Sequence, residues 1–121
     1  MLSLSPSVRI LLCLSAVDCR KSFDSLAALV HQALGHDPLS GYWFVFRNRA
    51  GDRLKILAWQ EDGYAIWYKR LEAGVFQFPV VSGDGPARLE IRAAELAMLL
   101  DGVVLEKVQR RKRYHRPATA K

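Results

Sequence analysis

A two-residue alternation of side-chain character runs through the middle of the chain, from residue 42 to residue 71. Tyr42, Phe44 and Phe46 share one side of its first run, and glycine-containing turns at residues 48–52 and 60–63 separate this run from two more. Period two is typical of β-strands, because successive side chains point to opposite faces of a sheet. Short turns join antiparallel neighbours. The middle of the chain is therefore predicted to form a meander of antiparallel hairpins.

The flanking segments add strands and two helices to this meander. Short apolar runs bounded by turn residues predict further strands, and apolar steps of three and four residues predict helices. The additional strands are expected at residues 8–14, 75–78 and 89–91, and the helices at residues 23–34 and 92–101. Asp18 or Ser22 can cap the first helix, and Gly35 can end it. The predicted fold class is α+β: an antiparallel sheet of about five to six strands, with one helix near each end and a basic tail.

The positive charge is concentrated at one end of the chain. The formal net charge is +6, yet all twelve acidic residues lie at or before Glu106. Residues 1–106 carry eleven cations and twelve acids, a formal −1, and we expect them to form a single α+β domain. Residues 107–121 carry seven cations and lose the hydrophobic periodicity, which predicts a disordered tail.

A tail of this kind favours polyanions, whether nucleic acid, an acidic protein face or an anionic membrane. Lysine and arginine side chains bind DNA by neutralising phosphates and releasing counterions, without reading the base sequence. The alternatives are a solubilising tail and a contact for an acidic partner protein. We favour nucleic acid, and the candidate residues in the tail are Lys107, Arg110, Arg111, Lys112, Arg113 and Arg116.

A second basic set surrounds the first predicted hairpin and continues onto the next strand. Its members are Arg47, Arg49, Arg53, Lys55, Lys69 and Arg70. Arg53 and Lys55 are two residues apart on a strand, so they point to the same side and could form a flat surface that contacts phosphates. The tryptophans and tyrosines between these cations could stack on unpaired bases, but aromatic residues in a small sheet more often belong to the core. We therefore interpret the aromatic residues as core.

Nothing in the sequence favours catalysis or a bound cofactor. The aspartates fall in predicted turns and caps, and His31 and His36 are five residues apart, a spacing that does not place them on one helical face. Walker and nucleophile-elbow motifs are absent from the sequence. The two cysteines are too few for a disulfide framework and have no zinc-ligand spacing. We expect no enzyme activity, no metal, no cofactor, no membrane association, and a cytoplasmic protein that is associated with the nucleoid if it binds DNA.

Several motifs in order along the chain resemble those of one known family. They are residues 18–26 (DCRKSFDSL), 44–49 (FVFRNR), 52–57 (DRLKIL), 67–72 (WYKRLE), 76–79 (FQFP) and 99–102 (LLDG). With them the chain resembles TnpB, the small accessory protein of insertion-sequence-66 transposons, over nearly the whole body. The resemblance implies participation in transposition beside a separate transposase that supplies the catalytic acidic residues. Cys19 stands where the family usually has methionine, which argues against thiol chemistry.

Two functional hypotheses remain at this point. In the first, the protein is a non-catalytic accessory factor that binds DNA, either transposon ends or any sequence, through its basic residues. In the second, it is an adaptor that assembles or stabilises the transposase complex without touching DNA, through the aromatic sheet or the helix at residues 92–101. Homo-oligomers are compatible with both hypotheses.

Overall fold

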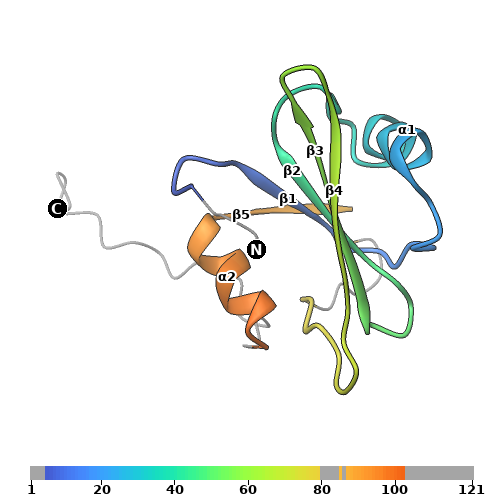
Figure 1. The fold of residues 1–121 in the computed structure, drawn as a ribbon, viewed down its shortest axis with the longest axis vertical. Coiled ribbons are helices and arrows are strands. Elements are labelled where there is room, and N and C mark those ends of the chain that lie inside the picture. The colour runs from blue at the N-terminus through green and yellow to red at the C-terminus, as the bar shows by residue number, and fades with distance from the viewer. Residues whose placement is uncertain (1–4, 80–84, 86, 103–121) are drawn as a thin grey trace, which may run out of the picture.

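A single five-stranded sheet organises the protein, with two helices packed against it (Figure 1). The computed structural model describes residues 5–79, 85 and 87–102, so the predicted tail at residues 107–121 and most of the loop at residues 82–86 lie outside the described part. In chain order the elements are β1 (Ile10–Cys13), α1 (Phe23–Ala33), β2 (Trp43–Arg47), β3 (Arg53–Gln60), β4 (Gly63–Arg70), β5 (Arg88–Ile91) and α2 (Ala93–Leu100). The predicted α+β class is confirmed.

The strand order is β4-β3-β2-β1-β5, and one pair departs from the predicted meander. β2, β3 and β4 are consecutive antiparallel neighbours, as the alternation predicts. β1, however, pairs with β2 in parallel, with Leu11 opposite Phe44. A parallel neighbour requires a long crossover connection, and α1 provides it. The carboxyl ends of β1 and β2 consequently lie at the same end of the sheet.

One face of the sheet is covered by α1. Leu26, Val30 and Leu34 project from this helix and are buried against Phe44 and Phe46 of β2. The helix begins after Ser22, whose backbone N–H donates to Ser25 Oγ at 3.0 Å. Burial of these apolar side chains is the principal stabilisation of the helix, because a helix this short is marginal alone in water. Phe23, the first residue of the helix, is 45% exposed.

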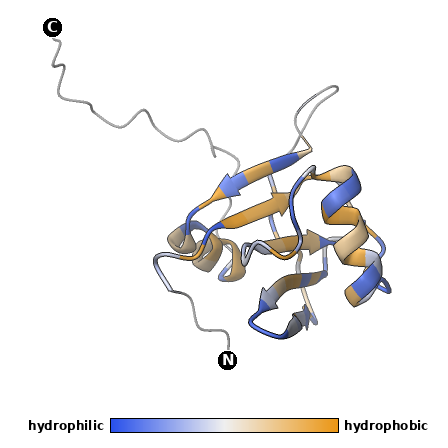
Figure 2. Ribbon diagram, turned by 90° about the horizontal axis from the view of Figure 1, so that it is seen from above, coloured by the Kyte–Doolittle hydropathy of each residue, from blue (hydrophilic) through white to orange (hydrophobic). Residues whose placement is uncertain are grey.

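The opposite face is covered by α2 and by an irregular segment at residues 75–79 (Figures 1 and 2). Leu96 and Leu99 of α2 pack into one cluster with Val45 and Ile56 of the sheet. The strand predicted at residues 75–78 is wrong. Phe76 and Phe78 are buried in the same cluster, but the Phe76 backbone N–H bonds only to the turn at Gly51, with an N···O distance of 2.7 Å. The alternation of apolar residues at positions 75–78 therefore reflects the burial of Phe76 and Phe78 and not pairing with a neighbouring strand.

Candidate nucleic-acid interface

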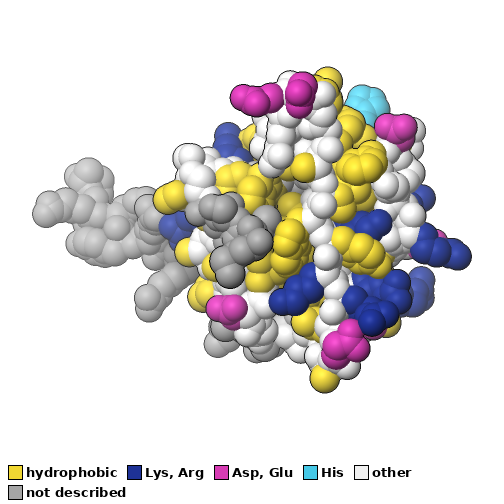
Figure 3. All heavy atoms as spheres, viewed as in Figure 1, with side chains coloured by type: hydrophobic (Ala, Val, Ile, Leu, Met, Phe, Trp, Pro, Cys, Tyr) yellow, Lys and Arg dark blue, Asp and Glu magenta, His cyan; other side chains and the backbone are white. Residues whose placement is uncertain are grey.

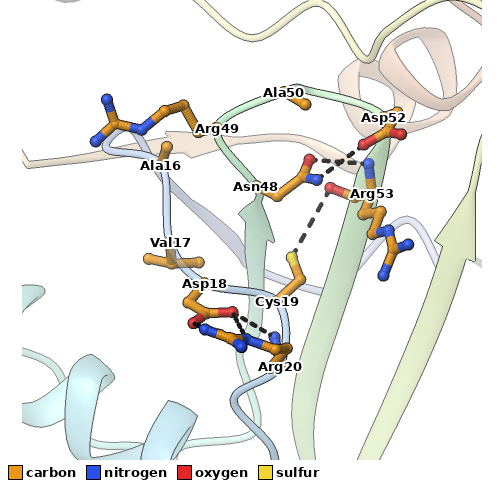
Figure 4. Close-up of a pocket in the computed structure, with 10 residues that line it drawn as sticks. All are labelled: Ala16, Val17, Asp18, Cys19, Arg20, Asn48, Arg49, Ala50, Asp52 and Arg53. Carbon is orange, nitrogen blue, oxygen red and sulfur yellow. Dashed lines mark hydrogen bonds and ion pairs between the residues drawn. The ribbon is translucent and has the colours of Figure 1, made fainter.

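An open cleft of about 600 Å³ lies at the carboxyl ends of β1 and β2 (Figure 4). Residues 16–20 form one wall and residues 48–53 the other. The parallel pairing of β1 and β2 brings these two loops together, and crevices at the carboxyl ends of parallel strands are common binding sites. Two hydrogen bonds hold the first wall against β2 and β3: the Val17 N–H donates to the carbonyl of Arg47 at the end of β2 at 2.9 Å, and Cys19 Sγ lies 3.9 Å from the carbonyl oxygen of Arg53 at the start of β3.

The side chain of Asn48 holds the turn that forms the second wall. Its Oδ1 accepts from the backbone N–H groups of Gly51 and Arg53, both at 3.0 Å, and its Nδ2 donates to the Asp52 carboxylate at 2.8 Å. Gly51 adopts φ +82°, a conformation that favours glycine. Arg49 and Arg53 leave opposite ends of this turn and extend in different directions (Figure 4). These guanidinium groups do not converge on one point, so the turn does not form a site that would enclose one small anion.

Arg20, on the first wall, is held by Asp18. Its Nε and Nη2 groups bond to the Asp18 carboxylate, with Nη2 2.8 Å from Oδ2. The hydrogen bonds from Arg20 lower the pKa of Asp18 from 3.8 to about 2. The Arg20 side chain is nevertheless 89% exposed. Because a guanidinium group has five N–H donors, Arg20 retains donors for a second acceptor such as a phosphate.

Further cations gather at the same end of the sheet, and together they form what we call the basic surface. Figure 3 shows lysine and arginine side chains collected around the lower end of β4 as drawn in Figure 1. The members of the basic surface are Arg20, Lys21, Arg49, Arg53 and Arg70, together with Lys69, which lies beside Arg70 at the end of β4 but points to the opposite face of the sheet. Three carboxylates accompany these six cations, namely Asp18, Asp52 and Glu72, which leaves a formal +3 on this surface. Since residues 1–106 carry −1 in all, the charge of the body is strongly segregated.

Arg47 and Lys55, two of the predicted DNA-binding residues, have internal partners. Lys55 is only 8% exposed, its ammonium group donates to the Lys21 carbonyl at 2.7 Å, and it lies 4.6 Å from the centre of the Tyr68 ring. The Arg47 guanidinium lies 4.9 Å from the centre of the Phe78 ring and donates to the Leu14 carbonyl at 3.3 Å. Arg53 and Lys55 do share a face, as predicted, but burial removes Lys55 from the accessible surface. We therefore leave Arg47 and Lys55 out of the basic surface.

The remaining predicted residues have different outcomes. Arg49, Lys69 and Arg70 are exposed, Arg53 is half-buried, and Arg70 forms an ion pair with Glu72 at 2.9 Å. The six candidate residues of the tail lie outside the described part of the chain. Sequence reasoning missed two members of the basic surface, Arg20 and Lys21, because nothing in the strand periodicity shows that β1 is parallel to β2.

The aromatic residues of the sheet are mainly structural, as interpreted from the sequence. Trp43 and Trp67 pack partly buried against the cluster beneath α2, and Tyr64 packs against the cluster beneath α1. Trp59 meets Tyr64 edge to face, with ring centroids 5.1 Å apart. Tyr68 differs because it is 46% exposed, and its hydroxyl accepts a hydrogen bond from Arg53 at 3.1 Å. An isolated exposed ring beside cations does not make a stacking platform.

Within residues 5–79, 85 and 87–102, histidine, cysteine and acidic side chains form no group of three or more that could hold a metal ion. Cys13 and Cys19 are buried free thiols, and burial raises the pKa of each. A buried thiol with a raised pKa is a poor nucleophile, because the thiolate is the reactive form. None of the helices in the described part is long and apolar enough to span a bilayer.

The fold and the site together define a class: a small α+β protein that presents an open, basic surface, with no metal-ligand cluster among its described residues. The family model of IS66 Orf2-like proteins matches residues 8–110, and the chain belongs to this family. Membership associates the protein with transposition of an insertion sequence, as an accessory protein. The resemblance expected from the motifs is thereby confirmed.

Two relatives come from Sinorhizobium fredii (strain NBRC 101917 / NGR234). The uncharacterized protein y4jC is 37% identical over 111 residues, which cover 92% of each chain. The uncharacterized protein y4hO is also 37% identical, over 85% of this chain and 87% of its own. No solved structure matches the chain. The family match ends at residue 110, so Arg111, Lys112, Arg113 and Arg116 lie beyond it.

Proposed function

We propose that the protein is a non-catalytic accessory factor of transposition that binds DNA through its basic surface and its basic tail, while a separate transposase performs the chemistry. The observation that carries this proposal is the collection of six cations at one end of a body whose total charge is −1. Arginines that point in different directions can each meet a different phosphate of a DNA backbone. The tail extends the same electrostatic mechanism with seven more cations.

Binding through phosphate contacts implies affinity for DNA in general more than preference for one base sequence. Contacts to phosphates position a protein on the duplex, whereas contacts to base edges select the sequence. The basic surface lies on loops and strand ends, and α1 presents a mixed polar and apolar outer side without a row of basic residues. We therefore infer that the protein binds duplex DNA of any sequence and leaves recognition of the transposon ends to the transposase.

The experiment that tests this proposal compares variants of the body for binding to labelled transposon-end DNA and scrambled DNA. The triple variant Arg20→Gln, Arg49→Gln, Arg53→Gln removes three cations from the basic surface. Arg9→Gln is the matched control, because Arg9 lies exposed before β1, at the opposite end of the sheet, and pairs with Glu90 at 2.9 Å. We expect the triple variant to bind both DNAs more weakly and Arg9→Gln to match the wild type. Wild-type affinity in the triple variant would refute the role of the basic surface.

A second candidate function is the adaptor, and a feature of α2 favours it. A hollow of about 400 Å³ beside this helix is lined by Pro6, Ala93, Ala94 and Ala97 together with Arg92, and Met98 is 40% exposed. Small apolar side chains around a hollow can accept an apolar side chain of a partner such as the transposase. Ala94→Glu, which places a carboxylate there, should abolish salt-tolerant co-purification with transposase if the adaptor function is correct. An unchanged complex, or no complex with the wild type, would exclude this function.

A further inference from the structure

The outer edge of β4 is a prominent surface of which the proposed function uses only the two cations at the end of the strand. β4 is the last strand in the sheet order, and no strand of the described residues lies beyond it. It contains eight residues, without proline, and each is paired in regular register with β3. A long and regular edge strand presents backbone groups that can pair with another strand, and proteins commonly protect such edges with proline, a bulge or distributed charge.

The backbone groups that point outward can be assigned from the register. Gln60 and Gly63 flank a two-residue connection and are therefore a hydrogen-bonded pair, after which bonded and non-bonded pairs alternate. The Leu71 N–H donates to the Asp52 carbonyl at 2.8 Å, which agrees with this alternation. The residues of β4 in the non-bonded pairs direct their backbone N–H and C=O groups away from β3. These residues are Tyr64, Ile66, Tyr68 and Arg70. Four residues of β4 thus offer donors and acceptors along the edge.

Charge is distributed along this edge with opposite signs at its two ends. Glu61 and Asp62 form the turn before β4, and Lys69 and Arg70 end the strand. Residues 63–68, between them, carry no charge. Figure 3 shows a strip of backbone that follows β4 between apolar side chains, with acidic groups at its upper end and, at its lower end, a gathering of basic groups with acidic side chains beside them. An antiparallel copy of the same strand would place each acidic end beside a basic end.

We infer that β4 pairs antiparallel with β4 of a second copy of this chain, which joins the two sheets into one continuous ten-stranded sheet. In the register that we assign, Ile66 lies opposite the partner's Ile66 on the two-fold axis, Tyr64 lies opposite the partner's Tyr68, and Asp62 lies opposite the partner's Arg70. Within β4, residues with outward-directed backbone groups lie opposite one another, as an antiparallel ladder requires. The two-fold axis repeats each contact, so the charge pair forms twice.

Three of the four neighbouring registers are less favourable. A shift by one residue places outward-directed backbone groups opposite groups that are already bonded to β3. A shift by two residues in one direction places Asp62 opposite the partner's Glu72, where like charges repel. The shift by two in the other direction replaces the Asp62–Arg70 pair by Glu61 opposite the partner's Lys69, and there Ala65, not Ile66, lies on the two-fold axis. Like charges directly opposite each other across strands destabilise the pair, and opposite charges stabilise it. The charges therefore favour an antiparallel second copy, and the position that cross-links, Ile66 or Ala65, decides between the two registers that keep an ion pair. The proposal does not depend on DNA binding.

The test is the molar mass of the full chain in solution over a wide concentration range at low ionic strength, by sedimentation equilibrium. We expect a reversible dimer. Asp62→Lys and Arg70→Glu should each weaken dimerisation roughly tenfold, because each turns two attractive contacts into repulsive ones. The double variant, Asp62→Lys with Arg70→Glu, should recover wild-type dimerisation within a few fold. Asp101→Lys, the same charge change on the exposed C-cap of α2, should have no effect.

A cross-linking variant checks the register independently. Ile66→Cys should give a covalent dimer under mild oxidation, because the two-fold axis places the new thiol opposite its own copy. Cys13 and Cys19 are buried and will not compete. Ala65→Cys, which faces the other side of the sheet and lies opposite the partner's Trp67, should remain monomeric under the same conditions. The proposal is overturned if the wild type has the mass of one chain at every concentration, if the double variant is no better than the single variants, or if β4 pairs only with the transposase.

Discussion

Replacement of Lys55 by methionine separates the structural cations from the DNA-binding ones. The Lys55 ammonium group connects β3 to the Lys21 carbonyl just before α1 and lies over the Tyr68 ring. A hydrogen bond from a charged group contributes about 1.5–3 kcal/mol, and a cation–π contact contributes about 0.5–2 kcal/mol more. Methionine keeps most of the stem and removes the cost of burying the charge, so the net loss in the free energy of unfolding should be about 2 kcal/mol. For a domain of this size, that loss lowers Tm by roughly 10 °C.

Lys69→Met is the matched control for Lys55→Met. Lys69 lies on the adjacent strand, opposite Leu54, and is exposed. Exposed substitutions of this kind usually change stability by about 0.5 kcal/mol or less. In thermal unfolding monitored by circular dichroism, Lys55→Met should therefore melt well below the wild type and Lys69→Met close to it. In DNA binding at a temperature where both variants are folded, the order should reverse, with Lys69→Met the weaker binder. Equal melting temperatures for the two variants would refute the structural role of Lys55.

Three further predictions follow from single residues. Gly51→Ala should lower the free energy of unfolding by about 1 kcal/mol more than Gly41→Ala in denaturant titrations: both glycines have positive φ, but only at Gly51 would the new Cβ approach Val75, at 3.1 Å. Carboxyl carbon chemical shifts should show Asp18 titrating near pH 2, and Arg20→Gln should move this pKa up towards 3.8. Because the folded-state pKa is lowered, the pair stabilises the fold above about pH 4, and this contribution is lost as the pH falls towards 2. Both cysteines should react with a thiol reagent at neutral pH only after denaturant unfolds the chain, and rapid reaction of the native protein would contradict their burial.

The strands and helices were largely predictable because each has a strong local pattern. Tyr42, Phe44 and Phe46 lie towards α1 and Trp43 and Val45 towards α2, which is the division that the alternation implied. The parallel pairing of β1 with β2 was not predictable in this way, since periodicity reports which residues share a face and not which strands are neighbours. The strand predicted at residues 75–78 failed for a related reason: two buried phenylalanines alternate equally well in an irregular segment.

The candidate site was predictable only in part. Arg49, Arg53, Lys69 and Arg70 were identified by their charge, and the structure places them around one end of the sheet; their contact with DNA stays a prediction. The internal contacts of Arg47 and Lys55 depend on elements distant in the sequence, because Phe78 covers the first and the segment before α1 accepts a hydrogen bond from the second. The local sequence around Arg47 and Lys55 cannot show that residues distant along the chain will pack against their side chains.

The central claim is that the protein binds DNA phosphates through its basic surface and tail. The salt dependence of duplex binding tests this claim most directly. Each phosphate contact adds about −0.9 to the slope of log Kobs against log[salt]. We predict a steep slope for the full chain, a slope shallower by several units after deletion of residues 107–121, and a further loss when Arg20, Arg49 and Arg53 are replaced by glutamine. A slope that is the same in all three proteins, or no binding by the full chain at low salt, would contradict the account.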